Sequence, residues 1–387
     1  MWYIQSNLIF YGLTISFHRS KEVFVCSLIV SLRCVFWVAP YIRGGGIDSP
    51  RPASQRAAAF ILTAAMLTTL AAPAFAGTWY IEDGDITVKA GETEGTNKVS
   101  QGANQEVEDT DTIIKNREDK ASSNTVTINA EDKNDKVEVT LKDVNIDASR
   151  GSEAAVSVTG KGDTNIELDG DNELQGGNRH AGLEHNQTVD SKGNVTSGKL
   201  TIQDDNDNAG SLTATGGYFG AGIGGGSAKA GQVTITGGTI TAISGDGAGI
   251  GGGQGNMGSN AGNADIEISG GTIEATGGYT SAGIGGGCYG DAIIKITGDA
   301  VIKNATGGDF GAGIGGGGGG KGDITISGNA KIENAQGGYT GSGIGGGYGA
   351  ENDKDGNGNQ ITIKSNESGA PLSLIHISEP TRLQLIS

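Results

Sequence analysis

Short segments in which aliphatic and polar residues alternate recur along the second half of the chain. Each has two aliphatic residues separated by one polar residue, as in LTIQ, VTIT and IEIS, and the segments occupy residues 200–203, 233–236, 266–269, 294–297, 324–327 and 361–364. Because side chains of an extended chain alternate between its two faces, this pattern predicts strands with one buried and one exposed face. Successive segments start 28 to 37 residues apart, so the pattern is an internal repeat.

Two further segments complete each repeat. A second aliphatic segment occupies residues 211–217, 239–245, 272–278, 301–308 and 331–338. It is followed by the glycine motif, with the sequence GAGIGGG or a close variant, at residues 220–226, 247–253, 281–287, 311–317 and 341–347. Strands this short cannot bury an apolar face alone, but repeats stacked with parallel pairing form a continuous core. The sequence therefore predicts an all-β fold, a parallel β-helix (solenoid) of about eight to nine rungs.

The glycine motif indicates tight corners rather than flexibility. A glycine inside a strand costs about 0.5 to 1 kcal/mol relative to alanine, so glycines at the same place in every repeat predict positive φ angles or close backbone approach. Burial of aliphatic residues such as Ile235, Ile240 and Ile250 offsets this cost, at about 1.5 to 3 kcal/mol each. We expect the stacked repeats to be stable and an isolated repeat to be unfolded.

Repeats without the glycine motif extend the predicted β-helix over residues 125–371. One inward-facing aliphatic residue per rung gives up to about nine rungs, in a stack on the order of 40 Å long. These residues are Val126, Val139, Ile166, Ile202, Ile235, Ile268, Ile296, Ile326 and Ile363. Residues 77–124 are less periodic, and we predict that they form an N-terminal cap, because a solenoid needs a non-repeating end. A disordered linker is the alternative.

The segment 51–76 has the organisation of a secretory signal peptide. Arg51 and Arg56 form a basic region, residues 57–70 are mostly apolar, and Ala74-Phe75-Ala76 is a cleavage site of small residues. The mature chain is therefore predicted to start at Gly77 and to be secreted. Residues 1–50 are interpreted as over-translated upstream sequence, with a long signal region as the alternative.

The last segment, residues 372–387, is interpreted as an artefact. Its sequence LSLIHISEPTR is the in-frame translation of a transposase-type sequencing adaptor. On this interpretation the natural C-terminus, and any cell-wall anchor that it carries, is missing from the sequence.

Charge narrows the range of partners. The predicted mature stretch 77–371 holds 20 Lys and Arg against 41 Asp and Glu, a net charge of −21. Nucleic acid is excluded as a partner, since phosphate binding requires a basic face. Cys288 is the single cysteine of this stretch, so no intrachain disulfide forms, and no transmembrane segment is expected in the mature chain.

Several of these features together resemble a known group of proteins. The segment GTWYIEDGDITV, the IELDG rung and the glycine motif are similar to those of glycine-rich β-helical surface proteins of gut-type Gram-positive bacteria, which are often labelled carbohydrate-binding-domain proteins. The likeness covers essentially all of residues 77–371. It implies a β-helix that binds sugars at the cell surface, without marking the residues that would do so.

The four glycine motifs that begin with glycine also satisfy the dinucleotide-binding pattern GxGxxG, as at Gly220, Gly222 and Gly225. A true fingerprint opens a helix whose N-terminus meets the pyrophosphate, and no helical pattern follows any copy. Five copies in register therefore indicate architecture rather than a cofactor site.

One acidic loop matches the first half of a calcium-binding loop. Asp353, Asp355 and Asn357, followed by a glycine, place oxygen atoms at alternating positions around a turn. The bidentate glutamate of such a loop is replaced by Lys364. This loop is interpreted either as a weak calcium site or as a solvated acidic loop. No other cofactor is expected.

The sequence offers little for catalysis. His180 and His185 fall in one rung and could bind a metal ion together. We favour the alternative, that both are exposed histidines in a turn. A lyase acting on acidic polysaccharides would need basic residues beside a calcium site, and Arg150 and Arg179 are the only arginines within the rungs. No catalytic residue is assigned.

The most promising ligand-binding feature is a series of aromatic residues just before the glycine motifs. Four of five motifs have one, and the residues are Tyr218, Phe219, Tyr279, Phe310 and Tyr339. Stacking of the rungs predicts a column of aromatic rings along one edge, suited to sugar rings. Internal stacking that stabilises the corner is the alternative. Tyr289 and Tyr348 follow the motif in two repeats and would widen the patch.

We therefore predict a secreted or cell-surface, non-catalytic protein that binds polysaccharide or a surface glycan, attached to the cell wall through a missing C-terminus. The first alternative is a structural stalk or adhesin segment without its own ligand site. The second is an acidic-polysaccharide lyase.

Overall fold

A computed structural model of the chain describes side chains at residues 76–206, 208–255, 262–350 and 358–364, together with the backbone of five further strands. It divides the chain into two compact units, Met1–Ala71 and Ala72–Ser387. In the first unit, two antiparallel strand pairs are described: β1 (Asn7–Phe10) with β2 (Leu13–Ser16), and β3 (His18–Ser20) with β4 (Val23–Val25). The calcium-loop residues Asp353, Asp355 and Asn357 lie outside the described residues.

The second unit is a parallel β-solenoid, in which every full turn passes through three sheets in the same order. The first sheet contains β6 (Ile86–Ala90), β10 (Val126–Ala130), β13 (Val156–Gly160), β15 (Leu183–His185), β18 (Ile223–Gly224), β21 (Ile250–Gly251), β24 (Ile284–Gly285), β27 (Ile314–Gly315) and β30 (Ile344–Gly345). The second contains β5 (Thr78–Tyr80), β9 (Thr112–Lys115), β11 (Lys136–Lys142), the first part of β14 (Asp163–Gln175), β16 (Leu200–Gln203), β19 (Gly231–Ile235), β22 (Ala264–Ile268), β25 (Ala292–Ile296), β28 (Gly322–Ile326) and β31 (Gln360–Ile363). The third contains β12 (Asn145–Asp147), the second part of β14, β17 (Gly210–Thr215), β20 (Thr239–Ile243), β23 (Thr272–Thr276), β26 (Val301–Thr306), β29 (Lys331–Gln336) and β32 (Ser373–Ser378).

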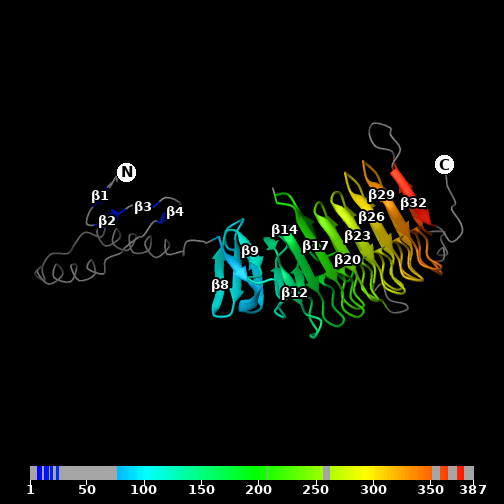
Figure 1. Cartoon of the computed structure of the whole chain (residues 1–387), viewed down its shortest axis with the longest axis horizontal. Helices are drawn as coiled ribbons and strands as arrows, with labels where there is room; N and C mark the ends of the chain where they lie inside the picture. The colour runs from blue at the N-terminus through cyan, green and yellow to red at the C-terminus, as the bar shows by residue number, and fades with distance from the viewer. Residues whose placement is uncertain are drawn as a thin grey trace, which may run out of the picture. The chain divides into compact units, whose positions relative to one another are not determined.

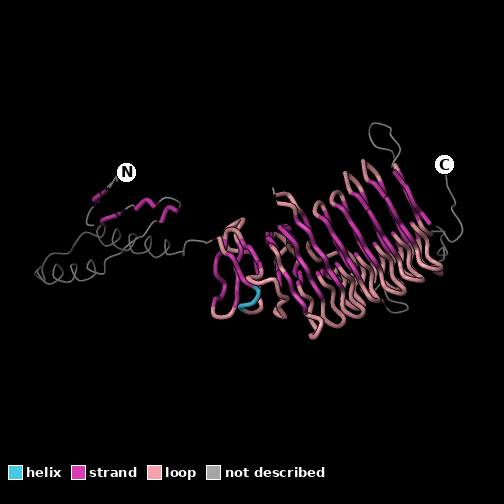
Figure 2. The backbone as a smooth tube through the Cα atoms, viewed as in Figure 1, coloured by secondary structure: helices cyan, strands magenta, loops and turns pink. Residues whose placement is uncertain are grey.

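Figure 1 shows the third-sheet strands β14, β17, β20, β23, β26, β29 and β32 side by side in sequence order. Their register confirms the predicted repeat, because each strand pairs in parallel with the corresponding residues one turn later. In Figure 2, strands and the loops joining them make up nearly all of the described chain. The fold class predicted from the sequence is therefore confirmed.

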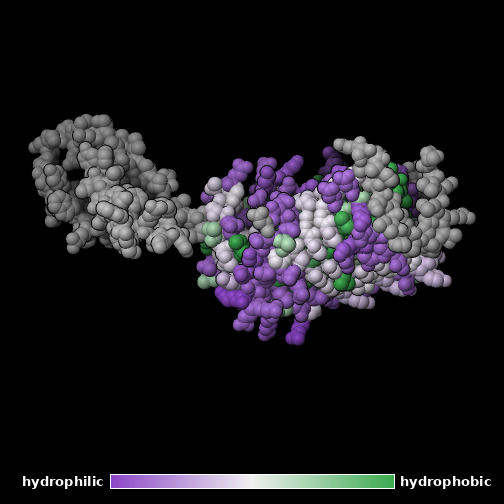
Figure 3. Space-filling view, turned by 45° about the horizontal axis from the view of Figure 1, so that its top comes forward, coloured by the Kyte–Doolittle hydropathy of each residue, from purple (hydrophilic) through white to green (hydrophobic). Residues whose placement is uncertain are grey.

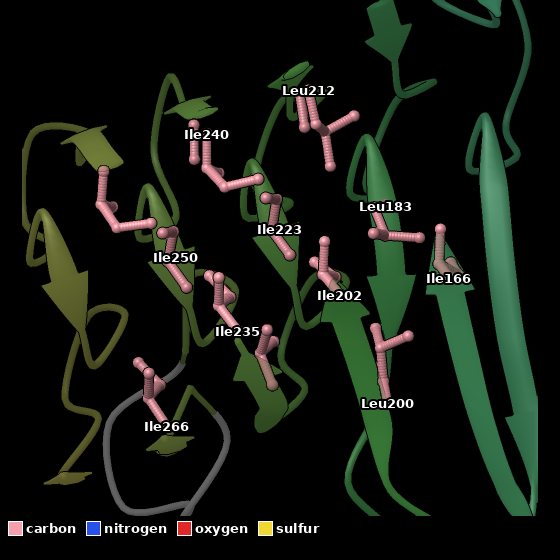
Figure 4. Packing of buried hydrophobic residues seen from close by; sticks show 14 of the residues in the cluster. Ile166, Leu183, Leu200, Ile202, Leu212, Ile223, Ile235, Ile240, Ile250 and Ile266 are labelled. Atoms are coloured by element: carbon pink, nitrogen blue, oxygen red, sulfur yellow. The ribbon is translucent and has the colours of Figure 1, made fainter. Parts of the chain in front are cut away.

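The core is a set of aliphatic columns enclosed by the three sheets (Figure 4). Each turn repeats the same inward positions, so that Ile235, Ile240 and Ile250 are fully buried. Ile250 pairs with the equivalent Ile284 of the next turn, and Ile240 with Ile273. Side chains packed in register in this way bury apolar area continuously along the stack, and that area is the main stabilising contribution.

The number of turns is about eight, at the lower end of the predicted range. Val126 lies in the first sheet and Val139 in the second sheet of the same turn, so counting each as a rung was wrong. Ile363 was expected to face inward and be buried, but 47% of it is exposed. It lies on the last described strand of its sheet, whose outer side has no described strand next to it.

The glycine motif allows neighbouring turns to approach at backbone distance. Its Ile-Gly pair forms the two-residue strand of the first sheet, and its glycine has a positive φ, +140° at Gly285 and +138° at Gly315. A Cβ atom placed on Gly285 would overlap the carbonyl oxygen of Gly315, the equivalent residue one turn later. Glycine is thus required both by its φ angle and by the space available.

Residues 77–124 are built differently from the turns that follow. Strands β6, β7 (Asn97–Gln101) and β8 (Asn104–Asp109) form an antiparallel meander at the end of the first sheet, and η1 (Ile81–Asp83) is a single helical turn. The Asp109 carboxylate accepts hydrogen bonds from the Gly77 backbone N–H at 2.8 Å and the Trp79 indole N–H at 2.6 Å. The role of this region as a cap stays a prediction.

Candidate functional site

The predicted aromatic residues lie at the corner between the third and the first sheet, in the two positions before each glycine motif. The pair in these positions is Tyr218-Phe219, Gly245-Asp246, Tyr279-Thr280, Asp309-Phe310 or Tyr339-Thr340. Backbone hydrogen bonds join successive corners, for example from the Phe310 N–H to the Tyr279 carbonyl at 3.2 Å. The solenoid therefore brings these positions together along one edge.

The rings do not form the single column that the sequence predicted. Tyr218 and Phe219 pack against each other with ring centroids 4.2 Å apart, and the Arg179 guanidinium lies 5.9 Å from the Phe219 centroid. The next corner has glycine and aspartate, which interrupts the series. A second group begins at Tyr279, whose ring meets that of Phe310 edge-on, at 5.2 Å and an interplanar angle of 86°.

The second group includes residues from both sides of the two-residue strand. Tyr348, which follows the last glycine motif, packs against Phe310 at a centroid distance of 5.5 Å. Tyr289 follows an earlier motif with a φ of +57°, and its ring covers Gly319 of the next turn, where a Cβ atom would lie 2.7 Å from Tyr289 Cδ1. Both tyrosines thus lie beside residues of neighbouring turns, and their predicted part in a ligand-binding patch stays a prediction.

Exposure separates the phenylalanines from the tyrosines. Phe219 and Phe310 are half-buried, whereas the tyrosines are more exposed, from 39% at Tyr289 through 56% at Tyr279, 58% at Tyr348 and 63% at Tyr218 to 85% at Tyr339. We call these five tyrosines the tyrosine edge. The two phenylalanines pack in the corner, and the tyrosines present ring faces and phenol hydroxyls to solvent.

This arrangement limits how a ligand is held. Edge-on contacts such as that of Tyr279 with Phe310 do not make one flat platform, so each tyrosine offers its ring face and hydroxyl separately. Tyr339, in the described part of the chain, has no ring contact with another aromatic residue. At 85%, it is also the most exposed of the five tyrosines.

The histidines are placed differently from the expectation. His185 is buried, with its Nδ1 atom 2.8 Å from the Gln232 carbonyl oxygen, and burial lowers the pKa of this imidazole. His180 is half-buried, with its Nδ1 atom 2.8 Å from Glu184 Oε2. The interpretation of both as exposed turn histidines was wrong for His185, which occupies an inward position of the first sheet.

Glu184 is a buried carboxylate that sequence reasoning did not single out. Its oxygens accept hydrogen bonds from the Ala181 backbone N–H at 3.1 Å and the Asn186 side-chain amide at 2.7 Å. The sequence does contain a feature that points to Glu184, because AGLEHN occupies the position at which later turns have AGIGGG. A charged residue in place of a glycine requires such partners.

No metal centre is evident in the part of the chain that the structure describes. There, no group of three or more histidine, cysteine, aspartate and glutamate side chains is arranged to hold a metal ion. The dinucleotide pattern at Gly220, Gly222 and Gly225 leads into β18 and then β19, not into a helix. These glycines are architectural.

The turns around the first aromatic corners match a family model described as a beta helix repeat. The match covers residues 208–227, 233–254 and 266–288, which run from β17 to β24. No curated protein and no solved structure matches the chain. No helix among the described residues is long and apolar enough to cross a membrane.

Proposed function

We propose that this protein is a secreted or cell-surface, non-catalytic β-solenoid that binds polysaccharide through the tyrosine edge. The observation that carries the proposal is the exposure of the tyrosines, which reaches 85% at Tyr339. A ring that remains in water contributes little to the core, so the stability of the solenoid does not account for its presence. Tyrosine combines an apolar face with a hydroxyl, which suits the faces and hydroxyl groups of sugars.

A polymeric ligand fits the repeating scaffold. Corners of successive turns are separated by about 4.8 Å, the spacing of hydrogen-bonded strands, and β-strands hold them rigidly. A chain of sugars lying along the edge would meet Tyr279 and Tyr339, which are two turns apart, with Phe310 packed in the corner between them. Weak contacts at each turn would add up along such a chain.

The hydrophilic surface agrees with a hydrated ligand. The face shown in Figure 3 is mostly hydrophilic, with scattered hydrophobic residues. The strong excess of acidic residues favours neutral or cationic glycans over polyanionic ones, because like charges repel. Secretion rests on the signal peptide predicted from the sequence, and attachment to a cell wall rests on the resemblance to bacterial surface proteins.

The structural-stalk alternative accounts for a different part of the corner. Phe219 and Phe310 are half-buried and contact other rings, which is the arrangement expected of residues that stabilise the solenoid. The five predicted aromatic residues thus divide, with Tyr218, Tyr279 and Tyr339 proposed as ligand contacts and the two phenylalanines as structural residues.

A survey of ligands tests the proposal. The purified chain is applied to a glycan array and to insoluble polysaccharides, with calcium or with a chelator. Saturable binding to one glycan class is expected, and a calcium requirement would assign a role to the Asp353 loop. Absence of binding to every surface, by protein with the circular dichroism of a β-fold, would favour the stalk. Release of unsaturated sugars would favour the lyase.

A further inference from the structure

A groove of about 760 Å³ lies where the strands of the second sheet begin. A hairpin-like excursion of the chain, residues 187–197, forms one wall. The other wall is made of residues at the start of β19, β22, β25, β28 and β31, on five successive turns. The groove therefore follows the stack for about 19 Å, four steps of about 4.8 Å each.

The hairpin has backbone groups that are free to pair. Its ladder bonds join the Thr196 N–H to the Thr188 carbonyl and the Asp190 N–H to the Asn194 carbonyl, at 2.8 and 2.9 Å. Val189 and Val195 are the residues opposite each other between these bonds. In an antiparallel pair of this kind, the N–H and C=O groups of the intermediate residues point outward from the hairpin. They are available to an added strand.

Aliphatic side chains line the groove on both sides. Val189 is 57% exposed, Val195 45% and Ile293 61%, and all three border the same space. Ile293 occupies an outward position on β25, where the equivalent residues one turn before and after are Asp265 and Asp323. Ile293 thus joins Val189 and Val195 in a group of exposed aliphatic side chains around one groove, and such a group, unlike a single exposed residue, indicates an apolar contact.

The charge of the groove favours a cationic occupant. Three carboxylates from successive turns line it, Asp265, Asp291 and Asp323, against the ammonium groups of Lys229 and Lys321. Asp265 is partly buried, and this burial raises the pKa of its carboxyl. A cation beside Asp265 would favour the ionised form.

We propose that this groove binds an extended, cationic peptide segment of about six residues, in which aliphatic residues alternate with lysine or arginine. An extended chain of that length spans about 19 Å, which matches the groove. Its backbone can pair with the edge of the hairpin, and the aliphatic side chains on one of its faces then contact Val189, Val195 and Ile293. The lysine or arginine side chains leave the other face, and their long flexible stems allow the charged ends to reach the carboxylates. None of the residues lining the groove is aromatic, unlike the tyrosine edge, so a peptide fits it better than a sugar.

The probes are three fluorescent hexapeptides measured by anisotropy with the full chain: Lys-Val-Lys-Val-Lys-Val, its Lys-Ser counterpart and its Glu-Val counterpart. We expect saturable binding of the first, weaker binding of the second and none of the third. The test variant is Ile293→Lys, which replaces the central apolar contact by a positive charge. It should weaken binding of the Lys-Val peptide by about tenfold or more.

Ile243→Lys is the matched control. Ile243 is also an exposed isoleucine on a strand, 41% exposed, but it lies on β20 in the third sheet, outside the groove. Both variants add the same charge, so Ile243→Lys should bind the peptide like the parent chain. Equal weakening by both variants would show non-specific attraction to an acidic protein and overturn the proposal, as would absence of binding by the folded parent chain. Glycan binding is measured separately and is expected to be unchanged by Ile293→Lys.

Discussion

Gly285 offers the sharpest test of how neighbouring turns are packed. It has a φ of +140°, and a Cβ atom on it would overlap the Gly315 backbone in the next turn. Gly84 has a similar φ of +131°, but nothing lies within 4 Å of its Cβ position. Comparison of Gly285→Ala with Gly84→Ala therefore separates the cost of the backbone conformation from the cost of close approach.

The two substitutions should lower the free energy of unfolding by different amounts. Gly84→Ala should lower the free energy of unfolding by about 1 to 3 kcal/mol, the cost of a backbone conformation that alanine rarely adopts. Gly285→Ala carries that cost and about 1 to 3 kcal/mol for an extra methyl group in a packed contact, giving about 2 to 6 kcal/mol. Since domains are stable by about 5 to 15 kcal/mol, the larger loss would be plain.

Urea unfolding followed by circular dichroism measures both losses. Gly245→Ala serves as a neutral control, because nothing lies within 4 Å of the Cβ position of Gly245 and it has no positive φ. Its effect should stay within about 0.5 kcal/mol. Equal losses for Gly285→Ala and Gly84→Ala would refute the close packing of the glycine motif against the next turn.

Two further predictions concern the corner and the groove. Phe310→Ala should lower the free energy of unfolding by about 1 to 3 kcal/mol, which is less than the loss expected for a fully buried ring. Tyr339→Ala should change it by less than about 0.5 kcal/mol, because the residue is exposed. Equal losses for the two variants in urea unfolding would show instead that both rings are structural. Burial raises the pKa of Asp265 above its ordinary value of 3.8, so its ionised form destabilises the fold at neutral pH. Asp265→Asn should therefore raise Tm at pH 7, with the gain fading as the pH falls toward 3.8, and an unchanged Tm at pH 7 would contradict the assignment.

The repeat pattern was enough to predict the fold. Period-two alternation located the second-sheet strands, and the spacing of the segments fixed which residues pair, as Ile235 with Ile268. The fold could be predicted because each turn has a short apolar face that is buried only when the turn packs against its neighbours. The number of turns was less certain, since Val126 and Val139 have similar patterns although they belong to different sheets.

The site was only partly predictable. Sequence placed the aromatic residues at one corner, but a shift of a single position between Tyr279 and Phe310 decides which ring packs and which is exposed. A shift of that kind depends on the backbone conformation of the corner, which the repeat does not fix. The groove could not be predicted at all, because it depends on where the excursion at residues 187–197 lies against turns far along the chain.

The central claim is that the tyrosine edge binds glycan independently of the stability of the fold. The most direct measurement is a binding isotherm on the selected polysaccharide for the parent chain and for the variant Tyr218→Ala, Tyr279→Ala, Tyr339→Ala, each with a melting curve. The account predicts at least about tenfold weaker binding by the variant, from loss of about 0.5 to 1.5 kcal/mol per ring, with Tm lowered by no more than the loss of the ring contacts of Tyr218 and Tyr279 explains. Unchanged binding by the folded variant would contradict the claim, and a loss of Tm beyond that of a Phe310→Ala variant would show that the tyrosines are part of the structural corner.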